Sequence, residues 1–330
     1  MADKTGIEWT DATWTVVQGC DYESPGCKHC YVPAVLWRLM HNPNPEIAGP
    51  LAGLIEKRGD TLVFTGKVAM REDRLNWPLY WSKPRRIFVP SHGDIFHPAV
   101  TDHFLDKIFA VMALCPQHTF QVLTKRAGRM RAYLAAAGRF EAIQAAIERL
   151  RLGEWGEGDT EDASDAWPLP NVWLGTSVED QSRADERIPL LLDTPAAKRF
   201  LSCEPMLGPV DLTKLHPGGA QTLDALAGVS VDPPYFDWPG IDWVIVGGES
   251  GKDARPMHPD WARSLRDQCK AASVPFFFKQ WGEWGFDPRT ISAKGRSFHH
   301  FEDGTIVQNY GKKAAGRLLD GREHNDIPTP

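Results

Sequence analysis

Three of the six cysteines in this chain lie within eleven residues, at Cys20, Cys27 and Cys30. Three thiolates without an evident fourth ligand suit a four-iron iron-sulfur cluster, because ligation at three corners leaves one iron open to a substrate or cofactor. A zinc knuckle that uses His29 or a distant residue is the alternative, since Cys-x2-Cys is a common half of a zinc site. Disulfides fit less well, because three clustered thiols cannot pair evenly and no secretory signal precedes them.

The rest of the chain alternates short apolar runs, each ending in polar residues, with helical periods. The first run, residues 13–17, leads directly into the stretch that holds these three cysteines, residues 19–31, which we call the cysteine segment. Six further runs lie at residues 86–90, 119–123, 171–175, 198–202, 242–246 and 275–279. Helices are expected at residues 33–41, 101–115, 127–152, 180–193 and 259–272, with a shorter helical piece at 71–81. Such alternation predicts βα units and a parallel sheet of about seven strands.

This alternation predicts an α/β fold built on a barrel. No Gly-x-Gly-x-x-Gly turn follows the first strand, which favours a partial or complete barrel over a doubly wound sheet. We expect residues 1–281 to form this barrel and residues 282–330 to form a C-terminal extension that packs near its mouth. Insertions are expected at about residues 42–70, 153–170 and 208–240, the second of them acidic. The third is a candidate lid, although a passive loop is the simpler interpretation.

Three phrases carry a family resemblance: Ser-Pro-Gly-Cys-Lys-His-Cys-Tyr at residues 24–31, Gly-Gly-Glu-Ser-Gly at 247–251 and Gly-Lys-Lys-Ala-Ala-Gly-Arg-Leu-Leu-Asp-Gly at 311–321. The chain resembles, over nearly its whole length, a radical S-adenosylmethionine (SAM)-like family found in phages and bacteria. Its first cysteine gap is six residues, whereas the usual radical SAM spacing is Cys-x3-Cys-x2-Cys. The resemblance implies a partial (βα)6-type TIM-like barrel, a 4Fe-4S cluster on the three cysteines, and SAM as a second cofactor. Such enzymes cleave SAM reductively to methionine and a 5′-deoxyadenosyl radical, which abstracts a substrate hydrogen.

Polar residues follow each expected strand, at the edge where ligands of parallel α/β folds gather. By resemblance, the SAM-binding residues are Tyr31 near the adenine, Ser91 and Asp94 at the ammonium, Lys125 or Arg126 at the carboxylate, and Thr176, Ser177 or Glu179 at the ribose. The usual Gly-Gly-Glu after the second strand is missing there. It occurs after the sixth strand, so Gly248 and Glu249 offer another ammonium site. Helix-capping or turn roles are the alternative for any one of these residues.

The candidate catalytic residues are Cys203 and Glu204, which end the fifth strand of the pattern. A thiol at Cys203 could donate a hydrogen atom to a substrate radical, although a small buried residue is the simpler interpretation. The tail, residues 289–322, carries seven basic against three acidic residues, interleaved with aromatic rings. That combination suits phosphates and stacked bases, whereas a solvated tail that packs across the barrel is the alternative. The predicted substrate-binding residues are Lys279, Trp281, Lys312 and Lys313, the last two placed beside the free amides of a helix start.

Composition narrows the class of function. The net charge of −6 argues against a uniformly basic nucleic-acid-binding protein, and no apolar run is long enough for a membrane span, so we expect a cytoplasmic protein. We expect a radical SAM enzyme that acts on a nucleobase, nucleotide or nucleic acid, for instance in phage DNA modification or repair. Its electrons would come from a flavodoxin or ferredoxin. The alternative is a non-catalytic zinc or iron-sulfur protein that binds nucleic acid or a partner protein.

Overall fold

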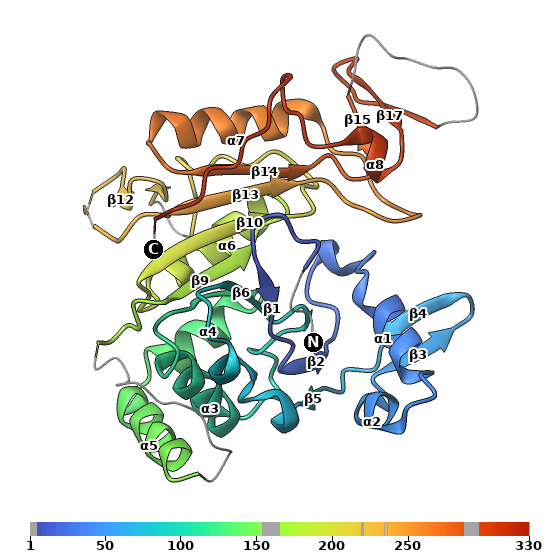
Figure 1. The fold of residues 1–330 in the computed structure, drawn as a ribbon. Helices are drawn as coiled ribbons and strands as arrows, with labels where there is room; N and C mark the ends of the chain where they lie inside the picture. Colours follow the sequence, from blue (N-terminus) through green and yellow to red (C-terminus); the bar gives the residue numbers. More distant parts are fainter. Residues whose placement is uncertain are drawn as a thin grey trace.

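A parallel sheet of seven strands forms the centre of the computed structural model, which describes residues 5–153, 166–218, 221–233, 235, 237–286 and 297–329. The strands lie in chain order: β1 (Ala12–Thr13), β6 (Arg86–Val89), β8 (Thr119–Thr124), β9 (Val172–Ser177), β10 (Lys198–Cys203), β13 (Trp243–Gly247) and β14 (Phe276–Gln280). Every neighbouring pair is parallel. Because each new strand joins the same edge, the sheet curls in one direction into a half-barrel with helices outside it (Figure 1). The predicted α/β partial barrel is confirmed, with seven strands.

Helices connect most of these strands: α3 (Asp102–Ala113), α4 (Ala127–Leu134), α5 (Arg139–Arg151), α6 (Gln181–Leu192) and α7 (Pro259–Ala271). The side chain of Thr101 caps α3 and that of Asp180 caps α6. The single helix expected over residues 127–152 is instead two helices. The chain turns between them at Gly138, whose φ of 75° favours glycine and ends the helical run.

The two faces of the sheet pack into separate layers, because side chains alternate along a strand. Outward-facing aliphatic residues such as Leu201 and Val244 pack under the helices. The inner face carries a cluster dominated by aromatic rings: Trp9, Trp173, Phe200, Trp243 and Phe277. The ring of Trp243 lies 6.0 Å from Trp9 and 6.2 Å from Trp173 between centroids, both edge to face. These rings fill the inside of the half-barrel below the ends of its strands.

The first predicted strand, residues 13–17, is divided in the structure. The barrel strand β1 ends at Thr13, and β2 (Val17–Gly19) leaves the barrel to pair with β7 (His92–Gly93) and β5 (Ala69–Met70). Glycine is required at this crossing, since a Cβ at Gly93 would overlap the carbonyl oxygens of Gly19 and Val17. The cysteine segment therefore follows a small separate sheet rather than a barrel strand.

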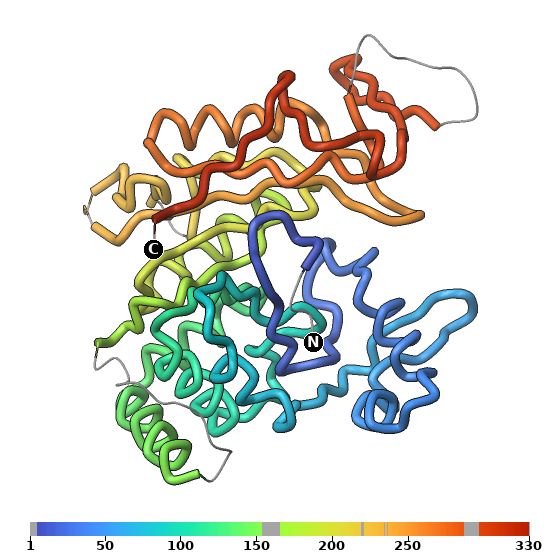
Figure 2. The backbone as a smooth tube through the Cα atoms, in the orientation of Figure 1, coloured from blue at the N-terminus to red at the C-terminus, as the bar shows by residue number. Residues whose placement is uncertain are grey.

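The insertion over residues 42–70 has its own small core. It contains α2 (Pro45–Ala48), η2 (Gly49–Leu51) and the hairpin of β3 (Ile55–Arg58) and β4 (Thr61–Phe64), which pack with α1 (Val32–Met40) around Leu36 and Leu51. The helical piece expected at 71–81 consists of two short 3-10 turns, η3 (Glu72–Arg74) and η4 (Trp77–Tyr80). The insertion over residues 42–70 projects to one side of the barrel, as the tube in Figure 2 shows. The acidic residues 154–165 lie outside the described residues.

The described part of residues 208–240 is attached to the helices on the outside of the barrel. Their described part includes the hairpin of β11 (Leu223–Asp224) and β12 (Val229–Ser230). The amide of Asp211 donates to Gln181 Oε1 in α6 at 2.7 Å, and that of Leu212 donates to Gln268 Oε1 in α7 at 2.8 Å. This segment thus takes the place that a crossover helix between β10 and β13 would occupy.

The C-terminal residues contribute a small sheet and a covering strand. The sheet is antiparallel, in the order β15 (Trp284–Gly285), β17 (Ile306–Asn309) and β16 (Phe298–His300), and is followed by the single turn α8 (Lys312–Ala315). The chain then runs along β14, where the Phe278 amide donates to the His324 carbonyl at 3.0 Å and Trp243 Nε1 donates to the Asp326 carbonyl at 2.8 Å. This tail covers the open edge of the half-barrel, which would otherwise expose unpaired backbone groups. None of the helices within the described ranges has the length and apolar character to cross a bilayer.

Candidate active site

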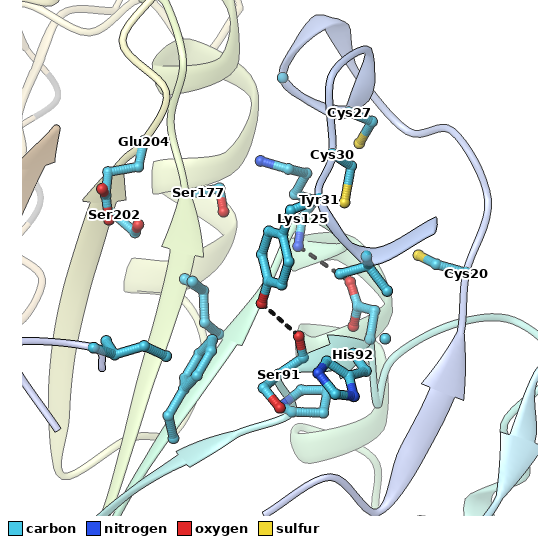
Figure 3. A pocket seen from close by; sticks show the side chains of 18 of the residues that line it. Cys20, Cys27, Cys30, Tyr31, Ser91, His92, Lys125, Ser177, Ser202 and Glu204 are labelled. Atoms are coloured by element: carbon cyan, nitrogen blue, oxygen red, sulfur yellow. Dashed lines mark hydrogen bonds between the residues drawn. The ribbon is translucent and has the colours of Figure 1, made fainter. Parts of the chain in front are cut away.

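The C-terminal ends of the strands surround a cavity of about 940 Å³. Among the residues that line it are Cys20, Cys27, Cys30, Tyr31, Ser91, Asp94, Lys125, Arg126, Ser177, Ser202, Glu204, Gly248, Glu249, Lys279 and Lys312. Figure 3 shows the three sulfurs on one side of this space and Ser177, Ser202 and Glu204 on the other, with Tyr31 and Lys125 between them. The aromatic cluster inside the barrel forms the floor, since Trp9, Phe88 and Leu123 also line the cavity.

Cys20, Cys27 and Cys30 are unpaired thiols, and each is only partly buried. Burial and the charge of Asp94 raise the pKa of Cys20 to about 12, and burial raises the pKa of Cys30 to about 11. The thiolates that a metal requires are therefore disfavoured without a bound cationic group, and metal binding would release protons here.

The three cysteine sulfurs do not form one tight group in this structure. Within the described ranges, the one group of three metal-binding side chains whose ligand atoms all lie within 4.8 Å of one another is elsewhere, at His258, Asp260 and Asp303.

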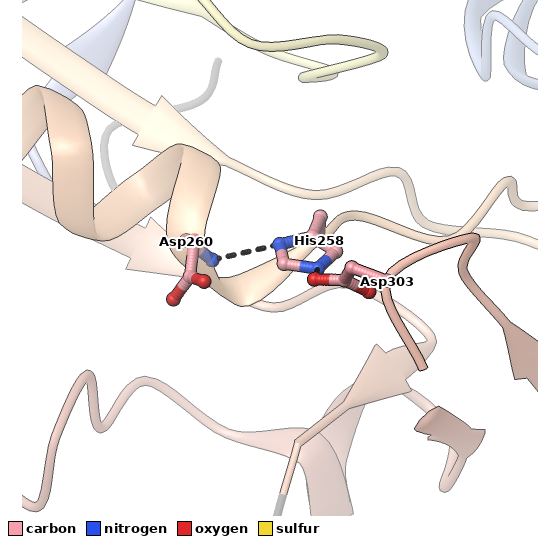
Figure 4. A group of neighbouring side chains, drawn as sticks. All are labelled: His258, Asp260 and Asp303. Carbon is pink, nitrogen blue, oxygen red and sulfur yellow. Dashed lines mark hydrogen bonds and ion pairs between the residues drawn. The ribbon is translucent and has the colours of Figure 1, made fainter. Parts of the chain in front are cut away.

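The group at His258 has a structural explanation (Figure 4). His258 is the N-cap of α7, and its Nδ1 accepts a hydrogen bond from the Asp260 amide at 3.1 Å. The other nitrogen, Nε2, consequently carries the proton and donates to Asp303 at 3.0 Å. Both ring nitrogens are thus used, and the group ties α7 to the turn between β16 and β17.

Arg126, after β8, anchors the start of the cysteine segment. Its Nη1 lies 3.6 Å from Cys20 Sγ and 3.1 Å from Asp94 Oδ2, and its Nη2 pairs with Asp21. Asp94 is itself buried and accepts hydrogen bonds from the Phe96 amide at 2.9 Å and from the Thr124 hydroxyl at 2.8 Å. The carboxylate of Asp94 is thereby committed to the chain's own donors. Its geometry suits holding Arg126 against Cys20 better than binding the ammonium of SAM.

Glu179, after β9, anchors the middle of the segment. Its carboxylate is fully buried and accepts from Ser24 Oγ and Lys125 Nζ, both at 2.6 Å, and from Arg187 Nη1 at 3.0 Å. Burial alone would raise the pKa of Glu179, but the charges of Lys125 and Arg187 outweigh it and lower the pKa. Glu179 does not line the cavity, so its position suits an anchor better than a ribose ligand.

Glu249, after β13, anchors the end of the segment. Its Oε2 lies 3.0 Å from Nδ1 of His29, and Arg255 binds both carboxylate oxygens at 2.6 and 2.9 Å. The two preceding glycines serve a different contact, because a Cβ at Gly247 would overlap Glu204 and one at Gly248 would overlap the Trp281 carbonyl. Glu249 of the Gly-Gly-Glu phrase is thus the residue that holds the cysteine segment.

Tyr31 completes the attachment, since its hydroxyl donates to the Ser91 carbonyl after β6 at 2.7 Å. The Ser91 hydroxyl pairs with Thr15 Oγ1 at 2.7 Å. Residues at the ends of β6, β8, β9 and β13 therefore all hold the cysteine segment. The arrangement fixes three thiols at the mouth of the barrel, which is what a preorganised metal site requires.

Besides Glu179, four residues predicted at the site do not line the cavity: Thr176, Cys203, Trp281 and Lys313. Cys203 is completely buried and packs in the outer layer beneath the helices, because it alternates with the inward-facing Ser202 and Glu204. Trp281 is buried and its Nε1 donates to the Leu318 carbonyl at 2.9 Å, so it anchors the tail.

The predicted anion site at Lys312 and Lys313 is already filled by a carboxylate. Glu283 accepts from the Lys312 amide at 3.1 Å and from the Gly251 amide at 3.0 Å. The helix that starts there is the single turn α8. Lys312 nevertheless lines the cavity, whereas Arg289, Lys294 and Arg296 of the basic tail lie outside the described residues.

The structure adds cavity residues that the sequence prediction did not assign: Trp9, Arg74, Trp77, His92, Ser202 and Gln280. Ser202 lies on β10 beside Cys203, and no sequence pattern marks which of the two faces inward. Arg74 and Trp77 come from the short turns after the insertion, where no sequence pattern indicates a site.

The Gly26→Ala variant should lose most of its bound metal while it keeps its fold. A Cβ at Gly26 would overlap the side chain of Glu179, which Lys125 and Arg187 hold in place, so the cysteine segment must move away. Iron content after anaerobic reconstitution and the circular dichroism spectrum measure the two effects. Gly49→Ala is the matched control, since no atom lies within 4 Å of the Cβ it would add. Equal iron in both variants would show that the contact with Glu179 does not position the segment.

Comparisons with known proteins place the chain in a family. No curated protein matches it. Two solved structures of spore photoproduct lyase mutants are similar, one with bound AdoMet and dinucleoside spore photoproduct and one with the dinucleoside spore photoproduct. Each is 9% identical and is matched over 92% of this chain and 69% of that chain, with TM-scores of 0.37 and 0.32. The family model described as "Protein of unknown function (DUF5131)" matches residues 4–328, and the chain therefore belongs to that family.

Proposed function

We propose that this chain is a radical SAM enzyme, in which Cys20, Cys27 and Cys30 hold a 4Fe-4S cluster and SAM binds in the adjoining cavity. The observation that carries the proposal is the position of three thiols, on one anchored segment, at a cavity in the mouth of a half-barrel. Ligation by three thiolates leaves one iron open toward that cavity. When bound, the cluster would supply the electron that cleaves SAM to methionine and a 5′-deoxyadenosyl radical.

The chain's own residues would hold the segment rigid and keep bulk water away from the reacting groups. Arg126, Glu179 and Glu249 fix the segment at three points along its length. The apolar floor of Trp9, Phe88 and Leu123 closes the cavity toward the barrel interior. A fixed apolar wall is suited to radical chemistry, because it limits side reactions on that side of the site.

Glu204 is the carboxylate best placed to bind the ammonium of SAM. Lys279 Nζ lies 3.2 Å from both carboxylate oxygens of Glu204, and both side chains line the cavity. A carboxylate beside an ammonium complements the two charges of an amino acid. The hydroxyls of Ser177 and Ser202 face the same space and offer partners for ribose. The proposed SAM contacts are therefore Glu204, Lys279, Ser177 and Ser202.

The Glu204→Gln variant should bind SAM about tenfold more weakly or worse, because a charge-assisted hydrogen bond contributes roughly 1.5 to 3 kcal/mol. Equilibrium binding of SAM to the reconstituted protein measures the effect, and iron content should not change. Glu302→Gln, an exposed residue of the C-terminal sheet that does not line the cavity, is the control. Unchanged SAM affinity in Glu204→Gln would exclude this carboxylate as the ammonium site.

Anaerobic reconstitution with iron and sulfide tests the proposed function as a whole. The expected results are a broad visible absorbance band, an EPR signal on reduction, and reductive cleavage of SAM. Because the reaction consumes an electron, a flavodoxin or ferredoxin would serve as the donor in the cell. Anaerobically purified protein that holds one zinc ion per chain and cleaves no SAM would instead support the non-catalytic metal protein.

A further inference from the structure

A separate part of the cavity wall is formed by residues from the segment between β1 and β6, together with one residue that follows β6. It comprises Arg74 of η3, Trp77 of η4, His92 of β7 and Phe64 of β4, and we call it the Arg74 lobe. His92 follows Ser91, whose carbonyl binds Tyr31, so the lobe adjoins the end of the cysteine segment. Figure 3 shows His92 and Ser91 together beneath Tyr31. None of these residues takes part in the attachment of the cysteines described above.

Arg74 is a mostly buried cation whose carboxylate partner, Asp73, is bound more closely by Arg71. Its side chain is 18% exposed, and its guanidinium lies 5.1 Å from the ring centroid of Trp77. The carboxylate of Asp73 is 3.8 Å away from Nε, beyond hydrogen-bond distance, and is bound instead by Arg71 at 2.6 and 2.8 Å. Nε of Arg74 is buried without a hydrogen-bond partner. Arg74 thus shares the carboxylate of Asp73 with Arg71, and a mostly buried cation that is only partly neutralised favours a bound anion.

His92 supplies a second unsatisfied group. Its Nδ1 is buried and has no hydrogen-bond partner. Burial and the charge of Arg74 lower the pKa of His92 to about 4, so the ring is neutral at neutral pH. His92 and Arg74 line the same cavity. A neutral imidazole beside a guanidinium can donate one hydrogen bond to an oxyanion.

The other charges that line the cavity are largely matched within the chain. Hydrogen-bonded ion pairs join Lys125 to Glu179, Arg126 to Asp94, Lys279 to Glu204 and Arg255 to Glu249. Among the described residues that line the cavity, Arg74 and Lys312 are the arginine and lysine side chains without a carboxylate at hydrogen-bond distance. The wall therefore carries uncommitted positive charge, which is complementary to an anionic ligand.

From this charge and the surrounding rings we infer that the Arg74 lobe binds the phosphate of a nucleotide, which is the substrate of the proposed reaction. Arginine binds phosphate through paired N–H groups, and Trp77, Phe64 and Tyr31 offer ring surfaces for a base. A cavity of about 940 Å³ is at the upper end of the range for small-molecule sites, which leaves room for a second ligand beside SAM. The inference rests on the proposed function for the reaction, but the phosphate site itself does not require the cluster.

The test measures binding of nucleoside monophosphates, the matching nucleosides, inorganic phosphate and short single-stranded oligonucleotides to the reconstituted protein with SAM. We expect nucleotides to bind at least tenfold more tightly than nucleosides. Arg74→Gln should reduce that affinity tenfold or more, and Arg74→Lys should restore part of it. Tighter binding of mononucleotides would identify a free nucleotide as the source of the phosphate, and tighter binding of oligonucleotides would identify a nucleic-acid strand.

Arg85→Gln is the matched control, because Arg85 stacks on Trp81 at 5.0 Å but does not line the cavity. It should change nucleotide affinity less than twofold, and thermal unfolding of both variants checks that each is folded. Wild-type protein that cleaves SAM but binds neither nucleotides nor phosphate would overturn the inference and leave the proposed function standing. Arg74-dependent nucleotide binding in protein that forms no cluster would overturn the proposed function and leave the phosphate site standing. Equal affinity in wild type and Arg74→Gln would also overturn the inference.

Discussion

Replacing any one of Cys20, Cys27 and Cys30 with alanine should reduce the iron retained after anaerobic reconstitution to a small fraction of the wild-type amount. Each variant keeps only two thiolates in the segment, and two ligands cannot hold a cluster whose remaining corners face a cavity. SAM cleavage should fall below detection in all three variants, because in the proposed function the cluster delivers the electron. Iron and sulfide analysis, with EPR of the reduced protein, measures the loss.

Cys269→Ala provides the control for this experiment. Cys269 is fully buried in α7 and packs in the outer layer of the core, away from the cavity. Its substitution removes one buried sulfur and should lower stability slightly without any loss of iron. Iron retention at wild-type level in Cys20→Ala, Cys27→Ala or Cys30→Ala would contradict the assignment of that cysteine as a ligand.

The second large effect is expected from Glu179→Gln. The substitution keeps the shape of the side chain but leaves the charges of Lys125 and Arg187 without their buried counterion. Breaking a buried ion pair in this way costs about 3 to 5 kcal/mol. Because Glu179 also binds Ser24, the cysteine segment should loosen and retain less iron. Chemical denaturation measures the free energy of unfolding, and metal analysis measures the retention of iron.

The stability difference between wild type and Glu179→Gln should depend on pH, because the pKa of Glu179 is lowered in the folded protein. A carboxyl whose pKa in the folded protein lies below the ordinary value of 4.5 contributes stability above that value and loses it as the pH falls through the folded pKa. Wild type should therefore exceed Glu179→Gln in stability at pH 7, and the gap should narrow below about pH 4. Glu186 is an exposed residue of α6, the helix that follows Glu179. The free energy of unfolding of Glu186→Gln should differ from that of wild type by about 0.5 kcal/mol or less. A gap that stays constant down to acid pH would show that ionised Glu179 does not support the fold.

Local sequence patterns predicted the architecture. The repeated order of apolar run and helical period specifies βα units, since strand and helix periods differ and a crossover of this length requires parallel strands. Residues 119–123 and 198–202 lie within β8 and β10, and residues 259–272 correspond to α7. The spacing of Cys20, Cys27 and Cys30 likewise indicated a metal segment, because cysteines this close along the chain must also lie close in space.

The faces of the strands were not predictable in the same way. Strands of a parallel sheet are buried on both sides, so they carry no alternation of polar and apolar residues that would mark one face. Cys203 and Ser202 are equally plausible inward residues by sequence, yet the structure turns Ser202 into the cavity and Cys203 beneath the helices.

The roles of the charged residues were decided by tertiary structure alone. Glu249 and His29 lie 220 positions apart in the chain, and Glu179 and Ser24 lie 155 apart. From sequence alone, a carboxylate at a strand end is interpreted as a ligand site. The carboxylates of Glu249 and Glu179 instead bind side chains of the protein that only folding brings near. The types and spacing of the residues thus fixed which chemistry the chain can support. Which carboxylates remain open to a ligand depends on how distant segments pair their charges, because each buried charge must find a partner within the folded protein.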